Sequence, residues 1–240
     1  LSCGNTGCLM AGSAIKLRTL EGVERPALCT IWPGRERYFT LLDAGANPHA
    51  KPIHIVQSAI LGSNYARVAL ELVRPKVGLL TIGTEEGKGN DLIHETHSML
   101  KDIDGSIINY SGLIEGFQIF ENVVDVVVCD GFVGNIALKA VEGAVRFVGG
   151  HLQRAYSKSW LTRFCFLPLR PVKKMIDPRR YNGASFVGLD GVVIKSHGSA
   201  DRLAFLKAIE EALAEVDKNI PQLIKDNLHH TVSAEALKEE

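Results

Sequence analysis

One pattern recurs along this chain: a short apolar run, a polar turn that contains glycine, and then a segment with helical periodicity. The clearest example is residues 123–139, where the run VVDVVV precedes the turn CDGFVGN and an apolar-periodic segment at residues 136–148. A run rich in β-branched residues is typical of a strand buried on both faces of a parallel sheet. This order places polar groups at the carboxyl end of a strand, where open α/β sheets bind ligands, anions among them. Taken alone, the turn is explained equally well by the ordinary turn-forming chemistry of Gly and Asp.

The repetition of this order carries more weight than any single turn. Four or five such units predict an α/β protein with a parallel-rich, Rossmann-like sheet, three layers and one ligand crevice. The predicted strands are residues 27–31, 38–42 as a return strand, 76–82, 106–110, 123–128 and 192–195. The predicted helices are residues 8–20, 52–72, 92–101, 136–148 and 201–219.

The composition indicates the size and environment of the protein. The 240 residues can bury the core of one large domain, which we expect at residues 1–228, with residues 229–240 as a flexible tail. Lys and Arg total 27, as do Asp and Glu, so no overall positive charge favours nucleic acid as a partner. The five Cys form no CxxC pair, and no apolar run reaches the roughly 18 residues of a membrane span. We therefore expect reduced thiols, a cytoplasmic location and at most peripheral contact with a membrane.

Motifs of several other enzyme classes are absent from the sequence. The turn GTEEGKGND at residues 83–91 differs from a P-loop, because Gly rather than Ser or Thr follows the lysine. No GxGxxG, GxSxG or HExxH occurs, and His94 with His97 is too small a set for a metal site. We therefore expect no metal and no cofactor.

Residues 158–180 differ in character from the rest of the chain. They hold seven basic residues and one acid among bulky apolar residues, and Pro168 and Pro171 prevent one continuous helix. This mixture is typical of a surface that docks on a membrane or a partner, and equally of a helical pair packed on its own domain or on a dimer mate. We expect a protruding basic and apolar helical hairpin at residues 151–180. Its candidate docking residues are Trp160, Phe164, Phe166 and Leu167.

Five ordered stretches of the chain together resemble the PlsX-type phosphate acyltransferase family. They are SCGNTGCLMAG, LLDAGANPHAKP, GLLTIGTEEGKGND, VVVCDGFVGNIALK and YNGASFVGLDG with IKSHGS, and they extend from residue 2 to about residue 219. The resemblance implies transfer of a fatty acyl group from acyl carrier protein to inorganic phosphate, which forms acyl phosphate for phospholipid synthesis. It also implies a homodimer in peripheral contact with an anionic membrane surface, and the fold of the phosphotransacetylase and isocitrate dehydrogenase group.

The chain departs from this family at a few points. Family members carry an additional N-terminal segment with a DAMGGD-like motif, whereas this sequence opens with LSCGNTG and no initiator Met. We therefore expect an N-terminally short member of the family. Cys3 and Cys8 stand where the family usually has Ala, and the turn at residues 32–37 resembles an insertion.

The resemblance implies that Lys88 and Asn135 are the first catalytic candidates. Lys88 would hold phosphate as a point charge, and the amide of Asn135 would donate to phosphate or to the developing oxyanion. His197 would act as an acid for the departing thiolate or as a phosphate ligand. The candidate phosphate- and substrate-binding residues are Asn5, Thr6, Gly7, Asp43, Gly89, Asn90, Asp130 and Gly134. Asp43 and Asp130 are expected to orient Lys88 or the turns, because a bare carboxylate repels a dianion.

Three other functions are compatible with parts of the sequence. The first is a phosphotransacetylase-like enzyme that uses acyl-CoA, which the basic and apolar residues 158–180 disfavour. The second is a non-catalytic, truncated protein that binds carrier protein or membrane. The third and weakest is an oxidoreductase of the isocitrate dehydrogenase type, because the sequence holds no acidic metal-binding cluster.

Overall fold

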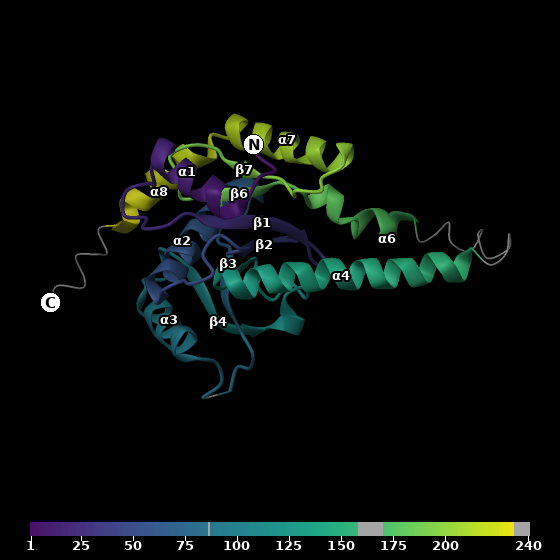
Figure 1. Cartoon of the computed structure of the whole chain (residues 1–240). Coiled ribbons are helices and arrows are strands. Elements are labelled where there is room, and N and C mark those ends of the chain that lie inside the picture. Colours follow the sequence, from purple (N-terminus) through teal and green to yellow (C-terminus); the bar gives the residue numbers. More distant parts are fainter. Residues whose placement is uncertain (86, 158–169, 233–240) are drawn as a thin grey trace.

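The structure is a computed structural model, and it describes residues 1–85, 87–157 and 170–232. Its centre is a seven-stranded sheet in the order β4-β3-β5-β2-β1-β6-β7 (Figure 1). The strands are β1 (Ala27–Pro33), β2 (Tyr38–Leu42), β3 (Lys76–Thr81), β4 (Asn109–Glu115), β5 (Val126–Val128), β6 (Ala184–Val187) and β7 (Ile194–Lys195).

Half of this sheet is parallel and half is antiparallel. β2, β5, β3 and β4 pair in parallel, which confirms the prediction of a parallel-rich sheet for this part of the chain. β1 pairs antiparallel with β2 and with β6, and β6 pairs antiparallel with β7. The connection between β1 and β2 is too short for a parallel crossover and closes through a hydrogen bond from Gly34 N to Arg37 O. The predicted return strand at residues 38–42 is therefore confirmed.

Helices cover both faces of the sheet, as the sequence predicts for a three-layer α/β protein. On one face lie α2 (Pro52–Ala69), α3 (Asp91–Asp102) and α8 (Ile220–Val232), and on the other lies α4 (Gly131–Tyr156) (Figure 1). The side chains of β5 alternate between the two cores, as a strand requires. Val126 and Val128 pack with α2, whereas Val127 packs in the cluster that Leu138 of α4 closes. The remaining helices are α1 (Thr6–Leu17), α6 (Arg170–Met175) and α7 (Arg202–Asp217), with 3-10 turns η1 (Gly116–Gln118) and η3 (Pro178–Tyr181).

Some elements differ from the prediction for identifiable reasons. The stretch YNGAS at residues 181–185 favours a turn, yet β6 begins within it. Four residues are too few to show a period, and the buried Ser185 is polar. β4 begins three residues later than expected and extends to Glu115. The acidic and His-bearing composition after Pro221 favours a solvated terminus, but this is wrong for residues 221–228, because α8 buries Ile224 and Leu228 against α2.

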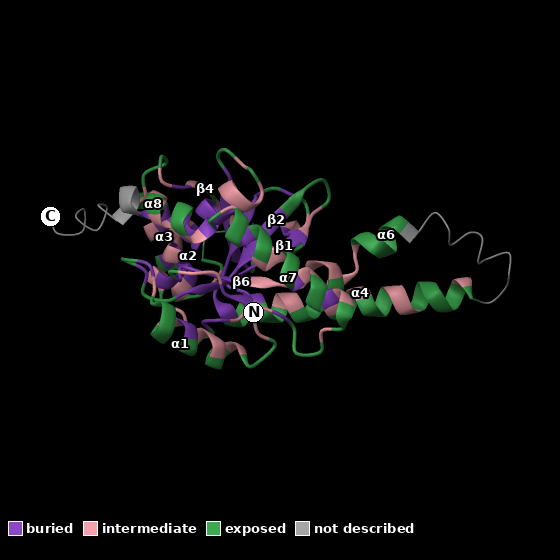
Figure 2. Cartoon of the chain, turned by 90° about the horizontal axis from the view of Figure 1, so that it is seen from above, coloured by how far each residue is buried: buried purple, intermediate pink, exposed green. Residues whose placement is uncertain are grey.

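The long helix α4 projects from the body of the molecule, and α6 lies near its outer part (Figures 1 and 2). α4 continues through Gly149 and Gly150 to Tyr156, well beyond the predicted end at residue 148. Most of its surface is exposed. The four docking candidates predicted at residues 160–167 lie outside the described residues. Within the described part of the chain, no helix is both long and apolar enough to span a membrane.

Candidate active site

The loop after β2 is organised by one buried carboxylate, that of Asp43. Its Oδ1 accepts hydrogen bonds from the backbone N–H groups of Leu28 (3.2 Å), Gly45 (3.0 Å) and Ala46 (2.7 Å). Its Oδ2 accepts from the backbone N and the side-chain amide of Asn47, at 2.7 and 2.8 Å. Burial raises the pKa of Asp43, and the hydrogen bonds oppose that rise. Asp43 therefore shapes a loop, in agreement with the expectation that it orients a turn.

The start of α4 is seated directly on this loop. The Asp130 side chain caps the helix by accepting from Phe132 N at 2.9 Å and Val133 N at 3.0 Å. Gly134 allows the close approach, because a Cβ there would lie 2.0 Å from the carbonyl oxygen of Asp43. Asp130 and Gly134 thus position α4, and through it the residues one and two turns further along.

The N-terminal segment reaches the same region along β7. Ser2 N donates to Ile194 O at 3.0 Å, and Ser196 N donates to Ser2 O at 2.9 Å, so the chain start runs parallel to β7. Asn5 then caps α1 by accepting from Cys8 N at 3.1 Å. This brings the amino end of α1, with its free backbone N–H groups, to the loop at residues 196–199.

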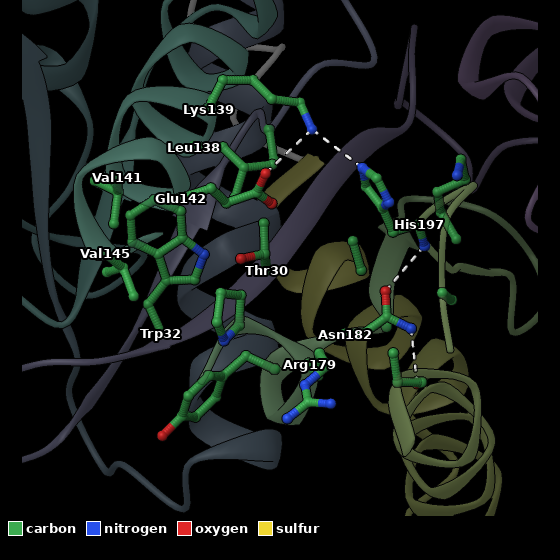
Figure 3. A pocket seen from close by; sticks show the side chains of 18 of the residues that line it. Thr30, Trp32, Leu138, Lys139, Val141, Glu142, Val145, Arg179, Asn182 and His197 are labelled. Atoms are coloured by element: carbon green, nitrogen blue, oxygen red, sulfur yellow. Dashed lines mark hydrogen bonds and ion pairs between the residues drawn. The ribbon is translucent and has the colours of Figure 1, made fainter. Parts of the chain in front are cut away.

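These elements surround a cavity of about 1110 Å³ (Figure 3). One part of its wall is polar and comes from α1, from α4 and from the loop after β7. The other part is apolar and comes from β1, α4 and the segment after α6. The polar side chains that line it include Asn5, Thr6, Asn135, Lys139, Glu142, Asn182, Lys195, His197 and Ser199.

His197 is held in one orientation by its neighbours. Its backbone N–H donates to Asn182 Oδ1 at 2.9 Å, while Asn182 Nδ2 donates to Ser196 Oγ and Ala204 O, both at 2.7 Å. On the ring, Nδ1 accepts from Ser199 N at 3.1 Å. With its proton on Nε2, the neutral ring accepts at Nδ1 from Ser199. With its proton on Nδ1, it donates to Ser199 Oγ, 2.8 Å away, and its Nε2 accepts from Lys139.

That Nε2 atom lies 3.3 Å from Nζ of Lys139 (Figure 3). Burial lowers the pKa of His197, and the charge of Lys139 lowers it further, so the ring is neutral at pH 7. Glu142 Oε2 lies 3.4 Å from Nζ of Lys139 and balances part of its charge. An anion beside the two nitrogens could accept from the ammonium group and, when the ring carries its proton on Nε2, from the imidazole N–H as well.

The structure brings together only part of the predicted site. Asn5, Thr6, Asn135 and His197 all line the cavity. Gly7, Asp43, Asp130 and Gly134 lie in the elements that support it, outside its lining.

Lys88, Gly89 and Asn90 belong to the loop between β3 and α3 and are not among the residues that line the cavity. Lys88 is exposed there, and Asn90 caps α3 by accepting from Ile93 N at 3.0 Å. A phosphate role for this loop stays a prediction.

Two cavity residues were missed by the sequence reasoning although a signal was available. Lys139 stands four residues after Asn135, so both occupy the same face of one helix. Lys195 stands two residues before His197 at the end of the last strand, and its ammonium group donates to Ser196 O. Burial lowers the pKa of Lys195.

Similar folds occur in solved structures of phosphotransacetylases. One from Streptococcus pyogenes matches with a TM-score of 0.58 at 13% identity, over 89% of this chain and 61% of that one. EutD phosphotransacetylase from Staphylococcus aureus matches with a TM-score of 0.53 at 15% identity, over 84% of this chain and 58% of that one. The fold is therefore a Rossmann-like α/β fold of the phosphotransacetylase kind, as predicted, while the relation to isocitrate dehydrogenase stays a prediction.

The sequence comparisons identify the family. The family model described as "Fatty acid synthesis protein" matches residues 1–223. The phosphate acyltransferase of Coxiella burnetii (strain RSA 493 / Nine Mile phase I) is 46% identical over 235 residues, which cover 96% of this chain and 68% of that protein. The phosphate acyltransferase of Hydrogenovibrio crunogenus is 49% identical over 228 residues, which cover 93% of this chain and 67% of that protein. The chain belongs to this family of acyltransferases and spans about two thirds of the length of these relatives.

Proposed function

We propose that the chain transfers a fatty acyl group from acyl carrier protein to inorganic phosphate, forming acyl phosphate. One observation carries the proposal: Nζ of Lys139 and Nε2 of His197 lie 3.3 Å apart at the polar end of a cavity that also has apolar walls. Phosphate matches the donor pair, and an acyl chain matches the apolar walls. Family membership supports the same reaction.

The reaction needs positioning more than covalent help from the protein. A phosphate oxygen attacks the thioester carbonyl carbon, the carbonyl becomes an oxyanion, and the C–S bond then breaks as the thiolate leaves with the electron pair. Lys139 and the Nε2–H of His197 hold the phosphate. The free N–H groups at the amino end of α1, beside Asn5 and Thr6, favour negative charge at the reacting centre. A thiolate leaves readily, since a Cys-like thiol has a pKa of about 8.5.

Replacement of Lys139 tests this assignment. Lys139→Met keeps most of the apolar part of the side chain but removes a charge-assisted hydrogen bond of about 1.5–3 kcal/mol, so we expect a loss of roughly 10- to 150-fold in kcat/KM for phosphate. Lys101→Met, on exposed α3 outside the cavity, is the control and should leave the rate unchanged. An unchanged rate in Lys139→Met would remove Lys139 from the phosphate site.

Lys88 is tested in the same assay. By resemblance to the family, Lys88→Ala is expected to lose more than about tenfold in rate, roughly 1.4 kcal/mol. If Lys88→Ala alone loses activity, the phosphate site lies in the loop at residues 83–91 rather than at Lys139. Unchanged acyl phosphate formation in Lys88→Ala would reject Lys88 as a catalytic residue.

The acyl donor separates this function from its alternatives. Acyl-(acyl carrier protein) and acyl-CoA of the same chain length are compared as substrates of the purified chain. We expect the carrier-linked donor to be preferred. Preference for acyl-CoA would favour a phosphotransacetylase-like enzyme, and acyl phosphate from neither donor would favour a non-catalytic protein that only binds carrier protein or membrane.

We also propose a cytoplasmic protein in peripheral contact with anionic membranes through residues 158–180. Among the described residues of this stretch, Lys173 and Lys174 are exposed, and Val172 and Met175 are half-exposed. A mixture of basic and apolar side chains suits an anionic interface. Sedimentation with anionic vesicles should weaken with salt and fall when Trp160, Phe164 and Phe166 become polar.

A homodimer is the remaining part of the proposal. α7 exposes large apolar side chains at i, i+3, i+7 and i+10, namely Leu206, Ile209, Leu213 and Val216. This spacing is that of a helix–helix seam. Leu213→Glu should shift the chain from dimer to monomer in sedimentation velocity, and a wild-type chain that sediments as a monomer contradicts the proposal.

A further inference from the structure

The cavity is far larger than a phosphate site requires. Lys139 and His197 occupy only its polar end, whereas mostly apolar side chains line the opposite side, together with Arg35, Glu121 and Arg179 (Figure 3). The apolar side chains are Trp32 and Phe120, Leu138, Val141 and Val145 of α4, and Met175 and Ile176. Resting on the proposed function, we propose that this apolar side binds the acyl chain and sets the preferred chain length, with Trp32 as its floor.

The floor is rigid. Trp32 is buried, and its ring stacks on Phe120 at a centroid distance of 5.6 Å with an interplanar angle of 18°. Phe39 meets Trp32 edge-on at 6.0 Å. All three belong to the core cluster on this face of the sheet, which Leu138 and Val141 complete. Close-packed aromatic rings move little, so an acyl chain that reaches Trp32 cannot extend further.

The wall comes from one face of α4. Leu138, Val141 and Val145 stand at i, i+3 and i+7 and form an apolar stripe. Lys139 and Glu142 each follow one member of this stripe by one residue and form a neighbouring polar stripe. One helix therefore lines both the phosphate end and the apolar side, so an acyl chain along the first stripe would bring its carbonyl to the second.

Thr30 supplies an independent sign of a ligand between the phosphate end and the apolar side of the cavity. It lines the cavity from β1, its side chain is buried, and its Oγ1 has no hydrogen-bond partner among the described residues. In Figure 3 it lies between Glu142 and Trp32. A buried hydroxyl without a partner is costly unless a ligand satisfies it. Oγ1 is covered by its neighbours, so the carbonyl oxygen of a thioester would accept from Thr30 once that side chain rotates toward the cavity.

A bulky side chain on the apolar side tests the proposal, because it shortens the space available to an acyl chain. Val145→Trp adds an indole to the cavity wall, whereas Val148→Trp is the matched control, since Val148 is half-exposed on the same helix and does not line the cavity. Hexanoyl and dodecanoyl donors are compared by kcat/KM. Each buried methylene raises kcat/KM by up to about fourfold, so the wild-type chain should have a kcat/KM for the dodecanoyl donor that exceeds that for the hexanoyl donor by more than about tenfold.

Val145→Trp should lower the dodecanoyl-to-hexanoyl ratio of kcat/KM at least about tenfold. Val148→Trp should keep the wild-type ratio. Equal ratios in the two variants would overturn the proposal, whereas no acyl phosphate from any donor with the wild-type chain would refute the proposed function instead. Thr30→Val should slow both donors about equally, because both share the carbonyl, and a loss confined to dodecanoyl would remove Thr30 from that role.

A binding measurement keeps the proposal testable without turnover. The chain has two Trp, so Trp160→Phe leaves Trp32 as the single tryptophan. A fatty acid with a nitroxide near its methyl end should quench Trp32 fluorescence more strongly than one with the nitroxide near its carboxyl end. Equal quenching, or none, would contradict the proposed direction of the chain whatever the activity of the variant.

Discussion

The contact between α4 and the loop after β2 makes one glycine decisive. Gly134→Ala would place a Cβ 2.0 Å from the carbonyl oxygen of Asp43, and heavy atoms at this kind of contact rarely come closer than 3.0 Å. The opposing atom belongs to the backbone of a buried loop, so α4 or the loop must move by roughly 1 Å. Overpacking of this kind costs typically about 1–3 kcal/mol, and we expect about 3 kcal/mol here because no side chain can rotate away.

A matched control lies on the same helix. Gly143 is exposed and a Cβ there would meet nothing within 4 Å, so Gly143→Ala should stabilise the chain by about 0.5–1 kcal/mol through helix propensity alone. For a chain of this size 1 kcal/mol corresponds to about 2–4 °C in Tm. We expect Tm to fall by about 6–12 °C in Gly134→Ala and to rise by about 1–4 °C in Gly143→Ala.

The same displacement should reach the site, because Lys139 lies in the third turn of α4 while His197 lies in a separate loop. Thermal melts followed by circular dichroism, together with the rate of acyl phosphate formation at 15 °C, separate the two effects. We expect at least a tenfold loss of rate in Gly134→Ala under conditions where it is folded, about 1.4 kcal/mol. A Tm equal to that of Gly143→Ala would refute the reasoning.

Three further predictions concern the core. Burial raises the pKa of Glu215 to about 7, so the folded chain binds a proton that the unfolded chain releases, and Tm should fall as the pH rises from about 5 to 7. Glu215→Gln should remove that part of the fall, as melts at several pH values would show. Asp43→Asn should cost about 2–4 kcal/mol in urea unfolding, because the amide NH₂ would face the N–H donors that the carboxylate now satisfies. Gly62→Ala should cost less than Gly134→Ala, about 1–2 kcal/mol in the same assay, because its Cβ would press on side chains, at 2.7 Å from Leu42 Cδ1 and 2.8 Å from Val126 Cγ1.

Each of these has a result that would contradict it. A Glu215→Gln variant whose Tm falls with pH as in wild type would show that other groups cause the dependence. Asp190→Asn is the control for Asp43→Asn, since Asp190 forms only an exposed 3.6 Å ion pair with Lys225 and should cost less than about 0.5 kcal/mol. Equal losses in the two Asp variants would mean that the buried hydrogen bonds contribute little. A loss in free energy of unfolding in Gly62→Ala as large as in Gly134→Ala would show that the neighbouring side chains cannot move to make room for the new Cβ.

In the proposed function, the two ends of the cavity serve opposite parts of one reaction. The polar end combines an ammonium group, an imidazole N–H and a helix amino terminus, all of which favour negative charge. The apolar side lies on a packed aromatic core that excludes water. A charged nucleophile and an apolar acyl chain need both environments within one cavity. α4 provides a polar stripe at one end and an apolar stripe along the other side.

Much of the fold followed from local patterns in the sequence. The runs at residues 38–42 and 76–81 are strands because their apolar residues can be buried on both faces, and Asn5 and Asn90 begin helices because their side chains satisfy free N–H groups. Asp130 does the same for α4, but that helix begins at Gly131, earlier than the predicted start at residue 136. Ordered motifs likewise identified the family. The four-residue strand β6 was not predicted, because so short a run shows no periodicity.

The composition of the site was decided by tertiary structure. Asn135 and His197 come from turns that the sequence marks, yet nothing in the sequence shows that they line a cavity which Lys88 does not. That depends on which turns meet in space: α4 seated on the loop after β2, and the chain start running along β7. Lys139 faces His197 only because two segments 58 residues apart are brought within 3.3 Å. Spacing along the chain records local conformation, whereas such a pair exists only once the sheet and its helices are packed.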